Sequence, residues 1–206
     1  MDDKSSVIER VYIEIKREVC SGTLLPGERV DIAGLCDRYH VSKSPIRSVL
    51  YQLVGEGLLE VRAHDGFYRP RLTPDSAADL INWMEDVLLI ALDMAEESID
   101  GPIAPTALPL DDRDHTASIE AIFEAIAALS GNSEVISTVQ NTNDRLRAIR
   151  RAQPAGLIDQ AREVQAFAAA ITENDYIQIR AQLTHFTQRR MDRLPNLVVS
   201  AYNRPQ

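Results

Sequence analysis

The sequence predicts a mainly α-helical protein: an N-terminal winged helix-turn-helix, with three helices and a small β-hairpin, followed by an all-α helical bundle. Two observations predict this fold. Residues 26–71 show the order helix, tight turn, helix and hairpin, and residues 74–195 place apolar residues at helical spacing in five successive segments. Thr73 and Pro74, a helix cap followed by proline, mark the boundary between domains 1–72 and 73–206.

A first helix is predicted at residues 4–21, and a short second helix begins after Asp31, a favourable N-cap residue. The second helix has an apolar face made by Ile32, Leu35, Cys36 and Tyr39. Residues 40–42 form a polar break. Ser42 is placed to cap the third helix, and Pro45 falls in its first turn, where a missing N–H costs nothing.

The third helix has the composition of a DNA recognition helix. Its buried face is predicted to contain Ile46, Val49, Leu50, Leu53 and Val54. Its other face carries Ser44, Arg47, Ser48 and Tyr51, with Lys43 at the N-terminal end. Cations suit phosphates and guanine edges, and short hydroxyls allow close approach to the DNA backbone. A polar face is common on surface helices, so this interpretation depends on the residues C-terminal to the helix.

The residues after the third helix are predicted to form a wing. Gly-Glu-Gly at 55–57 stops the helix, residues 58–61 are predicted as a strand, His-Asp-Gly at 64–66 as a tip, and residues 67–68 as a returning strand. A helix-turn-helix followed at once by a hairpin is a specific order, and it favours DNA binding.

These residues resemble the N-terminal domain of GntR-family bacterial transcription regulators. The resemblance covers about residues 7–72 and is carried by LPGERV and VSKSPIRSVLYQLVGEGLLEVRAHDGFYRP. In the family the basic residues contact DNA, the hydroxyls meet phosphates and the glycine tip enters the minor groove. The resemblance therefore implies a DNA-contacting set of Ser42, Lys43, Ser44, Arg47, His64 and Gly66. Lys43 stands where arginine is more usual, and lysine lacks the bidentate fork that reads a base.

The net charge of −9 does not exclude DNA binding, because the acidic excess lies in the second domain. Residues 1–71 contain eleven Lys or Arg and eleven Asp or Glu, so the rest of the chain carries the whole net charge. We expect a monomer to bind DNA weakly and with a strong dependence on salt. The affinity then depends on the local placement of Lys43, Arg47, Arg62, Arg69 and Arg71.

The helix predicted from Pro74 to about Ser98 has two apolar stripes and must be covered on two sides. One stripe contains Ile81, Met84, Leu88 and Ala91. The other contains Trp83, Val87, Ile90 and Met94. The bundle covers one side, and a second copy of the chain can cover the other; a central helix of a monomeric bundle is the alternative. A homodimer is favoured because helix-turn-helix proteins usually read two half-sites.

Residues 101–110 contain three prolines and are predicted to be a connector. Four further helices are expected after it, with apolar repeats that begin at Ile119, Val135, Leu157 and Ile179. Pro195 is predicted to end the last of these helices. The tail at residues 196–206 is then expected to be extended or frayed.

The bundle resembles the all-helical effector-binding domain called FCD, which follows the winged helix in one large GntR subfamily. FEAIAALSGN, DRLRAIRRA and EVQAFAAAITENDY carry the resemblance. Many members of that subfamily bind a divalent metal through an aspartate and three histidines. Alignment on SGN and END puts those positions at Ile119, Phe123, Val164 and Phe186. Hydrocarbon side chains have no lone pairs to offer, so the sequence predicts no metal and no cofactor, and an apolar core or pocket instead.

A small-molecule site is predicted around Thr142, the polar member of a buried helical stripe. In this hypothesis Thr142 orients a metabolite, with Asn141 and Arg145 beside it. The aromatic walls would be Trp83, Phe123, Phe167 and Phe186. In the alternative, the Thr142 hydroxyl bonds a carbonyl of its own helix and takes no part in binding.

Catalysis has little support, because the chain has nine glycines, no serine elbow, no phosphate loop and no Cys/His pair at working spacing. Cys20 and Cys36 are predicted to be reduced core residues. No stretch approaches a membrane span, and the N-terminus MDDKSS lacks the layout of a signal peptide. A cytoplasmic protein is therefore expected.

These observations predict a ligand-responsive transcription regulator that binds a pseudo-palindromic, double-stranded DNA operator as a homodimer and senses a small-molecule metabolite. Repression is the commoner mode in the family that the chain resembles. One alternative is an architectural or partner-binding winged-helix protein whose bundle no longer senses a ligand. Another is an all-helical enzyme with an appended winged helix.

Overall fold

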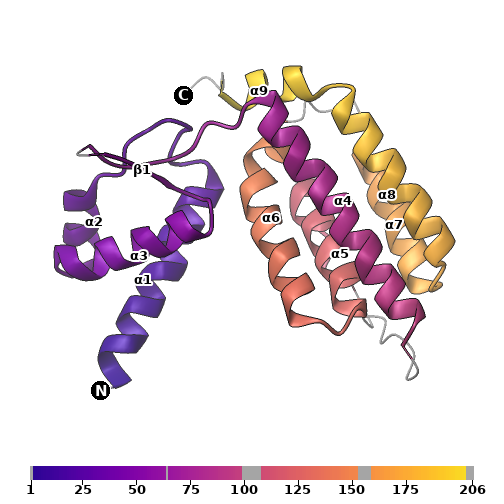
Figure 1. Cartoon of the computed structure of the whole chain (residues 1–206), viewed down its shortest axis with the longest axis horizontal. Coiled ribbons are helices and arrows are strands. Elements are labelled where there is room, and N and C mark those ends of the chain that lie inside the picture. The colour runs from indigo at the N-terminus through magenta and orange to yellow at the C-terminus, as the bar shows by residue number, and fades with distance from the viewer. Residues whose placement is uncertain (1, 64, 99–107, 153–158, 203–206) are drawn as a thin grey trace. The chain divides into compact units, whose positions relative to one another are not determined.

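The computed structural model describes residues 2–63, 65–98, 108–152 and 159–202, which fall into two compact units, Met1–Leu72 and Thr73–Gln206 (Figure 1). The predicted fold class is confirmed: a helix-turn-helix with a small antiparallel hairpin is followed by a bundle of helices. Within the described residues, no helix combines the length and the apolar character needed to cross a membrane. Most of the predicted connector, and Leu157, lie outside the described residues.

The first unit begins with three helices: α1 (Asp2–Ser21), α2 (Ile32–Tyr39) and α3 (Lys43–Gly55). α2 starts where predicted because the Asp31 carboxylate accepts hydrogen bonds from the N–H groups of Ala33 and Gly34. It ends at His40, whose left-handed backbone (φ 55°) turns the chain toward α3. Ser42 occupies the N-cap position of α3 but makes no capping hydrogen bond, so that part of the prediction is wrong.

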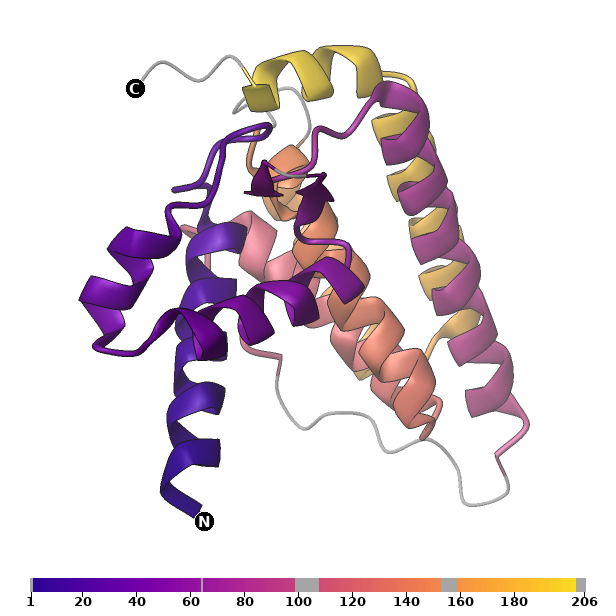
Figure 2. The same cartoon turned by 60° about the vertical axis from the view of Figure 1, so that its left-hand side comes forward.

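α3 crosses α1, as Figure 2 shows, and the two helices share one apolar core. α1 contributes Val11, Ile15 and Val19. α3 contributes Ile46, Val49, Leu50 and Leu53. Because these positions recur every three or four residues, one face of each helix is removed from water. The opposite face of α3 remains exposed.

The wing is an antiparallel hairpin of β1 (Glu60–Arg62) and β2 (Gly66–Tyr68). Val61 pairs with Phe67 at its centre. Arg29, from the loop before α2, forms an isolated bridge with Tyr68 on the other edge of β2. The entry loop of the domain is therefore tied to the wing.

The first strand of the wing begins two residues later than the predicted range 58–61. The N–H groups of Leu58 and Leu59 both donate to the carbonyl of Leu53, at 3.0 and 3.2 Å, so these residues continue the turn after α3. Their side chains are buried in the core. Leu58 and Leu59 therefore have the composition of a strand, but their backbone forms the turn that ends α3.

The second unit contains, within the described residues, α4 (Pro74–Glu96), α5 (His115–Leu129), α6 (Ser133–Arg151), α7 (Gln160–Thr172), α8 (Tyr176–Met191) and α9 (Leu194–Tyr202). α4 contacts α5, α6, α8 and α9, so the bundle is built around it (Figure 1). Thr73 caps α4 through reciprocal hydrogen bonds with Ser76, and Pro74 follows at the first helical position, as predicted.

The C-terminal helix α9 contradicts the prediction of an extended or frayed tail. Pro195 is the second residue of α9, where proline is tolerated because the first turn of a helix has no internal partner for its N–H groups. The side chains of Leu194, Leu197 and Val198 are buried, and α9 packs against α4 and α6. The proline that was expected to end a helix therefore lies in the first turn of the next one.

The two apolar stripes of α4 have different surroundings. All four members of the first stripe are buried, as expected: Ile81, Met84, Leu88 and Ala91. In the second stripe Val87 is buried, whereas Trp83 and Ile90 expose 50% and 47% of their surface. The second side of α4 is thus only partly covered by the described residues of this chain.

Candidate nucleic-acid interface and ligand cavity

The outer face of α3 presents the side chains that the sequence assigned to DNA. Ser42, Lys43, Ser44 and Arg47 are all exposed, because the core-facing positions of α3 lie on the opposite side of the helix. All four lie at the N-terminal end of α3. The backbone N–H groups of a first turn lack helical partners and attract anions, so this end of the helix suits phosphates.

Lys43 and Arg47 form no ion pair with any other described residue. The wing arginine Arg62 differs, because it pairs with Glu60 at 2.9 Å and its guanidinium carbon lies 4.0 Å from the centroid of the Tyr68 ring. A cation without a carboxylate partner keeps its charge available for a phosphate or a base edge. Lys43 and Arg47 thus differ from Arg62 in having no carboxylate partner among the described residues, and their contact with DNA stays a prediction.

The wing turns back at Gly66, which has a left-handed backbone (φ 118°) that favours glycine. A Cβ atom at Gly66 would lie 3.4 Å from Nε of Arg29. Arg29 is exposed and pairs with Asp65 at 3.8 Å, so it belongs to the wing surface, although the sequence interpretation did not include it. His64, predicted at the tip, lies outside the described residues.

Arg69 and Arg71, which were expected to add to DNA affinity, support the entry loop. Arg69 is buried, and its guanidinium donates to the carbonyl of Leu24. Arg71 donates to the carbonyl of Pro26 at 3.4 Å. The expectation for Arg69 is wrong, because a buried guanidinium that holds a loop is not available to a phosphate.

The helical unit contains a cavity lined by α4, α5, α6 and α8. Its apolar walls are Ile81, Met84, Leu88, Phe123, Leu146, Ile149, Leu183 and Phe186. The polar groups of its lining are Glu85, Arg150, Thr187 and Arg190. The cavity has room for roughly one or two water molecules, so a larger ligand requires side chains to move.

The phenylalanines that were predicted to surround a ligand come together in this unit. The ring centroids of Phe123 and Phe186 are 5.1 Å apart, and Phe167 packs edge-on against both, at 6.1 and 6.2 Å. Phe123 and Phe186 line the cavity, whereas Phe167 is fully buried and not part of the lining. Trp83 is half exposed on α4 and does not line the cavity.

The polar residues predicted at the ligand site do not line this cavity. The Thr142 hydroxyl donates to the carbonyl of Thr138 at 2.8 Å. This is the bond within its own helix that the alternative predicts, in which Thr142 takes no part in binding. Arg145 is partly buried, and burial lowers the pKa of its guanidinium. Asn141 is also partly buried. Unlike Phe123 and Phe186, these three residues are therefore not part of the cavity lining.

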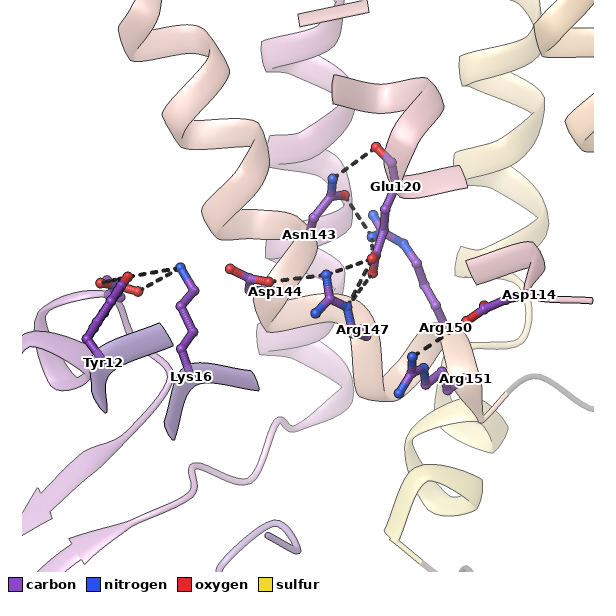
Figure 3. Close-up of polar contacts among 10 residues, drawn as sticks. Tyr12, Lys16, Asp114, Glu120, Asn143, Asp144, Arg147, Arg150 and Arg151 are labelled. Carbon is purple, nitrogen blue, oxygen red and sulfur yellow. Dashed lines mark hydrogen bonds and ion pairs between the residues drawn. The ribbon is translucent and has the colours of Figure 1, made fainter. Parts of the chain in front are cut away.

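A buried network between α5 and α6 centres on Glu120 (Figure 3). The Glu120 carboxylate accepts hydrogen bonds from Arg147 at 2.9 and 3.0 Å and lies 3.6 Å from Nη1 of Arg150. That Nη1 donates to the side-chain carbonyl oxygen of Asn143, at 2.8 Å. Burial lowers the pKa of Arg150 to about 10; Glu120 opposes this shift and the positive charge of Arg190 adds to it.

A second buried network joins α7 to α8. The Glu163 carboxylate accepts hydrogen bonds from Nη1 and Nη2 of Arg190, at 2.8 and 2.6 Å, and another from Arg189. The guanidinium carbon of Arg190 lies 3.3 Å from the centroid of the Phe186 ring. The Nε atom of Arg190 is buried and has no hydrogen-bond partner among the described residues. Burial lowers the pKa of Arg190, and Glu163 opposes this shift.

The sequence interpretation missed Arg150 and Arg190 as interior residues. Each follows a buried residue of its own helix by four positions, Leu146 in α6 and Phe186 in α8. An arginine in that register points to the same side of the helix as the buried residue. The helical periodicity therefore contained the signal, and the basic character of the two segments obscured it.

The four positions that FCD domains use for metal ligands lie in the apolar core as Ile119, Phe123, Val164 and Phe186. In the part of the chain that the structure describes, no three histidine, cysteine, aspartate or glutamate side chains are grouped to hold a metal ion. Hydrocarbon side chains in these places give the bundle an apolar centre with two arginines at its edge.

Comparison with known proteins places the first unit among regulators. Residues 7–68 match the family of bacterial regulatory proteins called the gntR family. An uncharacterized HTH-type transcriptional regulator in an unstable DNA locus of Streptomyces ambofaciens is 28% identical over 191 residues, 85% of this chain and 80% of the relative. The Nta operon transcriptional regulator of Aminobacter aminovorans is 28% identical over 135 residues, 61% of this chain and 64% of the relative.

Two solved structures are similar in fold to most of this chain. E. coli McbR/YncC has a TM-score of 0.67 at 18% sequence identity, with 92% of this chain and 97% of the other covered. A GntR transcriptional regulator from Rhodococcus sp. RHA1 has a TM-score of 0.64 at 16% identity, with 89% and 97% covered. At these identities the likeness extends to the fold and no further.

Proposed function

Because the chain is a DNA-binding transcription regulator with a gntR-family domain, we propose that it represses from a pseudo-palindromic operator as a homodimer and responds to a small metabolite. The family is one of transcription regulators and not of enzymes. The observation that carries the proposal is the exposed, carboxylate-free pair of Lys43 and Arg47 at the start of α3. The proposed place of action is the cytoplasm.

In this proposal α3 lies in the major groove. Arg47 reads a base edge, since a guanidinium can donate two parallel hydrogen bonds to a guanine. Lys43 holds a phosphate as a point charge, and the hydroxyls of Ser42 and Ser44 bond phosphate oxygens. The unbonded Ser42 side chain supports this role, because its hydroxyl is not used to cap α3.

The wing is proposed to enter the minor groove at its tip, with His64 and Gly66 against the DNA. Gly66 allows the backbone to approach closely, because it has no side chain and adopts a conformation that other residues avoid. Arg29 is added to this surface, since it is exposed beside the tip. A narrow minor groove attracts arginine through its negative potential.

For dimerisation we propose the exposed stripe of α4. Trp83 and Ile90 are seven residues apart, so they lie on one side of the helix about two turns from each other. Half-exposed aromatic and apolar side chains of this kind are enriched where two copies of a chain meet. Two copies supply two α3 helices, one for each half-site.

For the ligand response we propose an FCD-like helical domain that has lost its metal. Phe123 and Phe186 stay in the proposed ligand site because they line the cavity. The proposed ligand site no longer includes the other five predicted residues, because they do not line the cavity: Trp83, Asn141, Thr142, Arg145 and Phe167. Binding in the cavity would change the packing of α4, on which most of the bundle rests, and so bias the arrangement of the two DNA-reading domains.

The test is binding of the purified protein to DNA from just upstream of its own gene, against unrelated DNA, over a salt series. Selective binding that weakens steeply with salt is expected. Arg47→Ala should cost about 1–3 kcal/mol of specific binding, and Lys43→Ala should weaken binding to all sequences and lower the salt slope by about 1. Arg17→Ala, which removes an exposed cation of α1, is the control.

Equal and weak binding to both DNAs would contradict the operator-binding proposal. It would favour the alternative in which the winged helix is an architectural or partner-binding module. Selective binding that Arg47→Ala leaves unchanged would remove Arg47 from the reading face while keeping the regulator.

A further inference from the structure

Side chains of the wing and of the entry loop form one continuous row of contacts. In order along the row they are Glu60, Arg62, Tyr68, Asp65 and Arg29. Two of them are carboxylates and two are guanidinium groups, so the row carries no net charge. Binding to DNA of any sequence grows with the number of phosphates that a protein neutralises, and a neutral row adds little to it. The effect of the row on DNA binding must therefore come from its geometry.

The inner part of the row is fixed around Tyr68. The Arg62 guanidinium donates to one oxygen of Glu60 from Nε and Nη2, at 3.0 and 2.9 Å. The carbon of this guanidinium lies 4.0 Å from the centroid of the Tyr68 ring, which is buried. Glu60 and Tyr68 also stand opposite each other in the register of the hairpin. The Tyr68 hydroxyl is therefore held at one place on the wing.

Tyr68 in turn fixes the carboxylate of Asp65 near the tip of the wing. The Tyr68 hydroxyl donates to Oδ2 of Asp65 at 2.6 Å. This hydrogen bond is the main cause of a raised pKa of Tyr68, and burial adds to it, so the hydroxyl keeps the proton that it donates. The backbone N–H of Asp65 donates to the carbonyl of Arg62 at 3.0 Å. Both the backbone and the carboxylate of Asp65 are thus held in place.

The same carboxylate lies beside Arg29, which comes from the entry loop. The backbone of Arg29 forms the isolated bridge with Tyr68, so this residue runs along the edge of β2. Nη1 of Arg29 lies 3.8 Å from Oδ1 of Asp65. Nε and Nη2 lie over Gly66, at 3.4 and 3.6 Å from the place that a Cβ atom would take. Asp65 therefore meets one end of the guanidinium and leaves its other donors at the turn of the wing.

We propose that Asp65 is a positioning residue for DNA selectivity: it holds Arg29 in one orientation at the tip of the wing, from which the guanidinium enters a narrow minor groove. The inference rests on the proposed contact between the wing and the minor groove, and it names the residue that makes this contact selective. A narrow minor groove has a strongly negative potential and attracts arginine. A wider groove attracts it less and does not offset the repulsion between the Asp65 carboxylate and the phosphates.

The stability of the fold does not account for the contact between Asp65 and Arg29. Their side chains expose 54% and 62% of their surface, and the nearest nitrogen and oxygen are 3.8 Å apart. Exposed ion pairs of this kind contribute little to the free energy of unfolding. Variants of Asp65 should therefore keep the circular dichroism spectrum and the Tm of the wild type, so that changes in DNA binding can be measured on folded proteins.

The test is a titration of wild type and Asp65→Asn with DNA from just upstream of the gene and with unrelated DNA, over a salt series. Asparagine keeps an oxygen for the Tyr68 hydroxyl and loses the charge. Unrelated DNA should bind about fivefold more tightly, because the repulsion from one charge is removed. The salt slope for this DNA should steepen by about 1. Affinity for the upstream DNA should not rise, so the selectivity should fall by the same factor.

Glu9→Gln is the matched control for net charge. Glu9 is an exposed carboxylate of α1 in the same unit, and it lies outside the row. Its replacement changes the charge of the unit by the same amount as Asp65→Asn. The selectivity of Glu9→Gln should therefore equal that of the wild type.

Two further variants separate the position of Arg29 from the charge of Asp65. Tyr68→Phe keeps the ring and every charge but releases the carboxylate. It should lower affinity for the upstream DNA and leave both the binding of unrelated DNA and the salt slope unchanged. In an Arg29→Ala background, Asp65→Asn should have no further effect on selectivity, because Asp65 acts through Arg29.

Three results would overturn the inference. One is an equal or larger gain on the upstream DNA in Asp65→Asn, which would show that Asp65 acts only as a charge. The others are wild-type selectivity in Tyr68→Phe, and a loss of selectivity by Asp65→Asn that persists without the Arg29 guanidinium. Each of them leaves the operator-binding proposal intact, provided that the wild type prefers the upstream DNA. Equal and weak binding of the wild type to both DNAs would instead contradict that proposal and this inference together.

Discussion

The ring of Tyr51 meets the ring of Phe67 edge-on, with centroids 4.9 Å apart and an interplanar angle of 74°. Tyr51 lies on the outer face of α3 and Phe67 lies in β2, so the contact joins the recognition helix to the wing. The two elements that would enter neighbouring grooves of DNA are therefore braced against each other through a side chain that is half exposed.

Tyr51→Ala should loosen this brace. We expect a loss of about 0.5–1.5 kcal/mol of stability beyond the lost apolar burial, together with weaker operator binding. Chemical unfolding and DNA titration measure the two effects. Tyr51→Phe keeps the ring and serves as the control. Equal operator affinity for the alanine and phenylalanine variants would show that the brace does not matter for DNA.

Gly66→Ala should damage the wing, because alanine is strained by about 1–2 kcal/mol at the left-handed φ of this residue. The added Cβ would also lie 3.4 Å from Nε of Arg29. Gly55→Ala is the matched control, since that glycine ends α3 with nothing within 4 Å of an added Cβ. There the substitution should stabilise by about 0.5–1 kcal/mol. Thermal unfolding of both variants compares them, and equal Tm values would contradict the strain argument.

Trp83→Asp should convert the proposed homodimer into a monomer, because a charge would be placed in the apolar stripe of α4. Light scattering coupled to size exclusion gives the mass directly. Ile177→Asp, at a residue of α8 that is 82% exposed, provides a charge of the same kind away from the stripe and should leave the mass unchanged. A Trp83→Asp protein that keeps the wild-type mass would place the interface elsewhere.

Glu124 is expected to make the stability of the helical domain depend on pH. Burial raises the pKa of its carboxyl, and the neighbouring charges of Glu120 and Asp144 add to this effect. A pKa raised in the folded state contributes stability below the unfolded pKa, and this contribution is lost as the pH rises through the folded value. Glu124→Gln should therefore lose less Tm between pH 5 and pH 7 than wild type. The exposed Glu134→Gln should follow the wild-type profile, and parallel profiles for all three proteins would contradict this assignment.

The helices were predictable because each buries one stripe and has a strong local start signal. Asp31 and Thr73 cap α2 and α4 as the sequence indicated. The errors arose where tertiary packing overrode a local signal. Leu58 and Leu59 have the composition of a strand, yet their N–H groups close the end of α3. Pro195 lies in the first turn of α9, and the packing of Leu197 and Val198 in the core stabilises that helix.

The candidate DNA surface was easier to predict than the ligand cavity for a physical reason. The reading face of α3 lies on one helix, so its members share a simple spacing in the sequence. The cavity is built by four helices far apart in the chain, and only its aromatic walls, Phe123 and Phe186, were anticipated. Arg150 and Arg190 could be brought together only by the fold, because their pairing depends on how α6 and α8 pack.

The packing of α9 against α4 sets an order of events during synthesis. The first unit is compact by itself, so it can complete its fold soon after its last residue leaves the ribosome. Until α9, the last of the described helices, has been synthesised, α4 and α6 lack the helix that covers them at that end of the bundle. For that interval a nascent chain holds a finished winged-helix unit and an unfinished helical bundle.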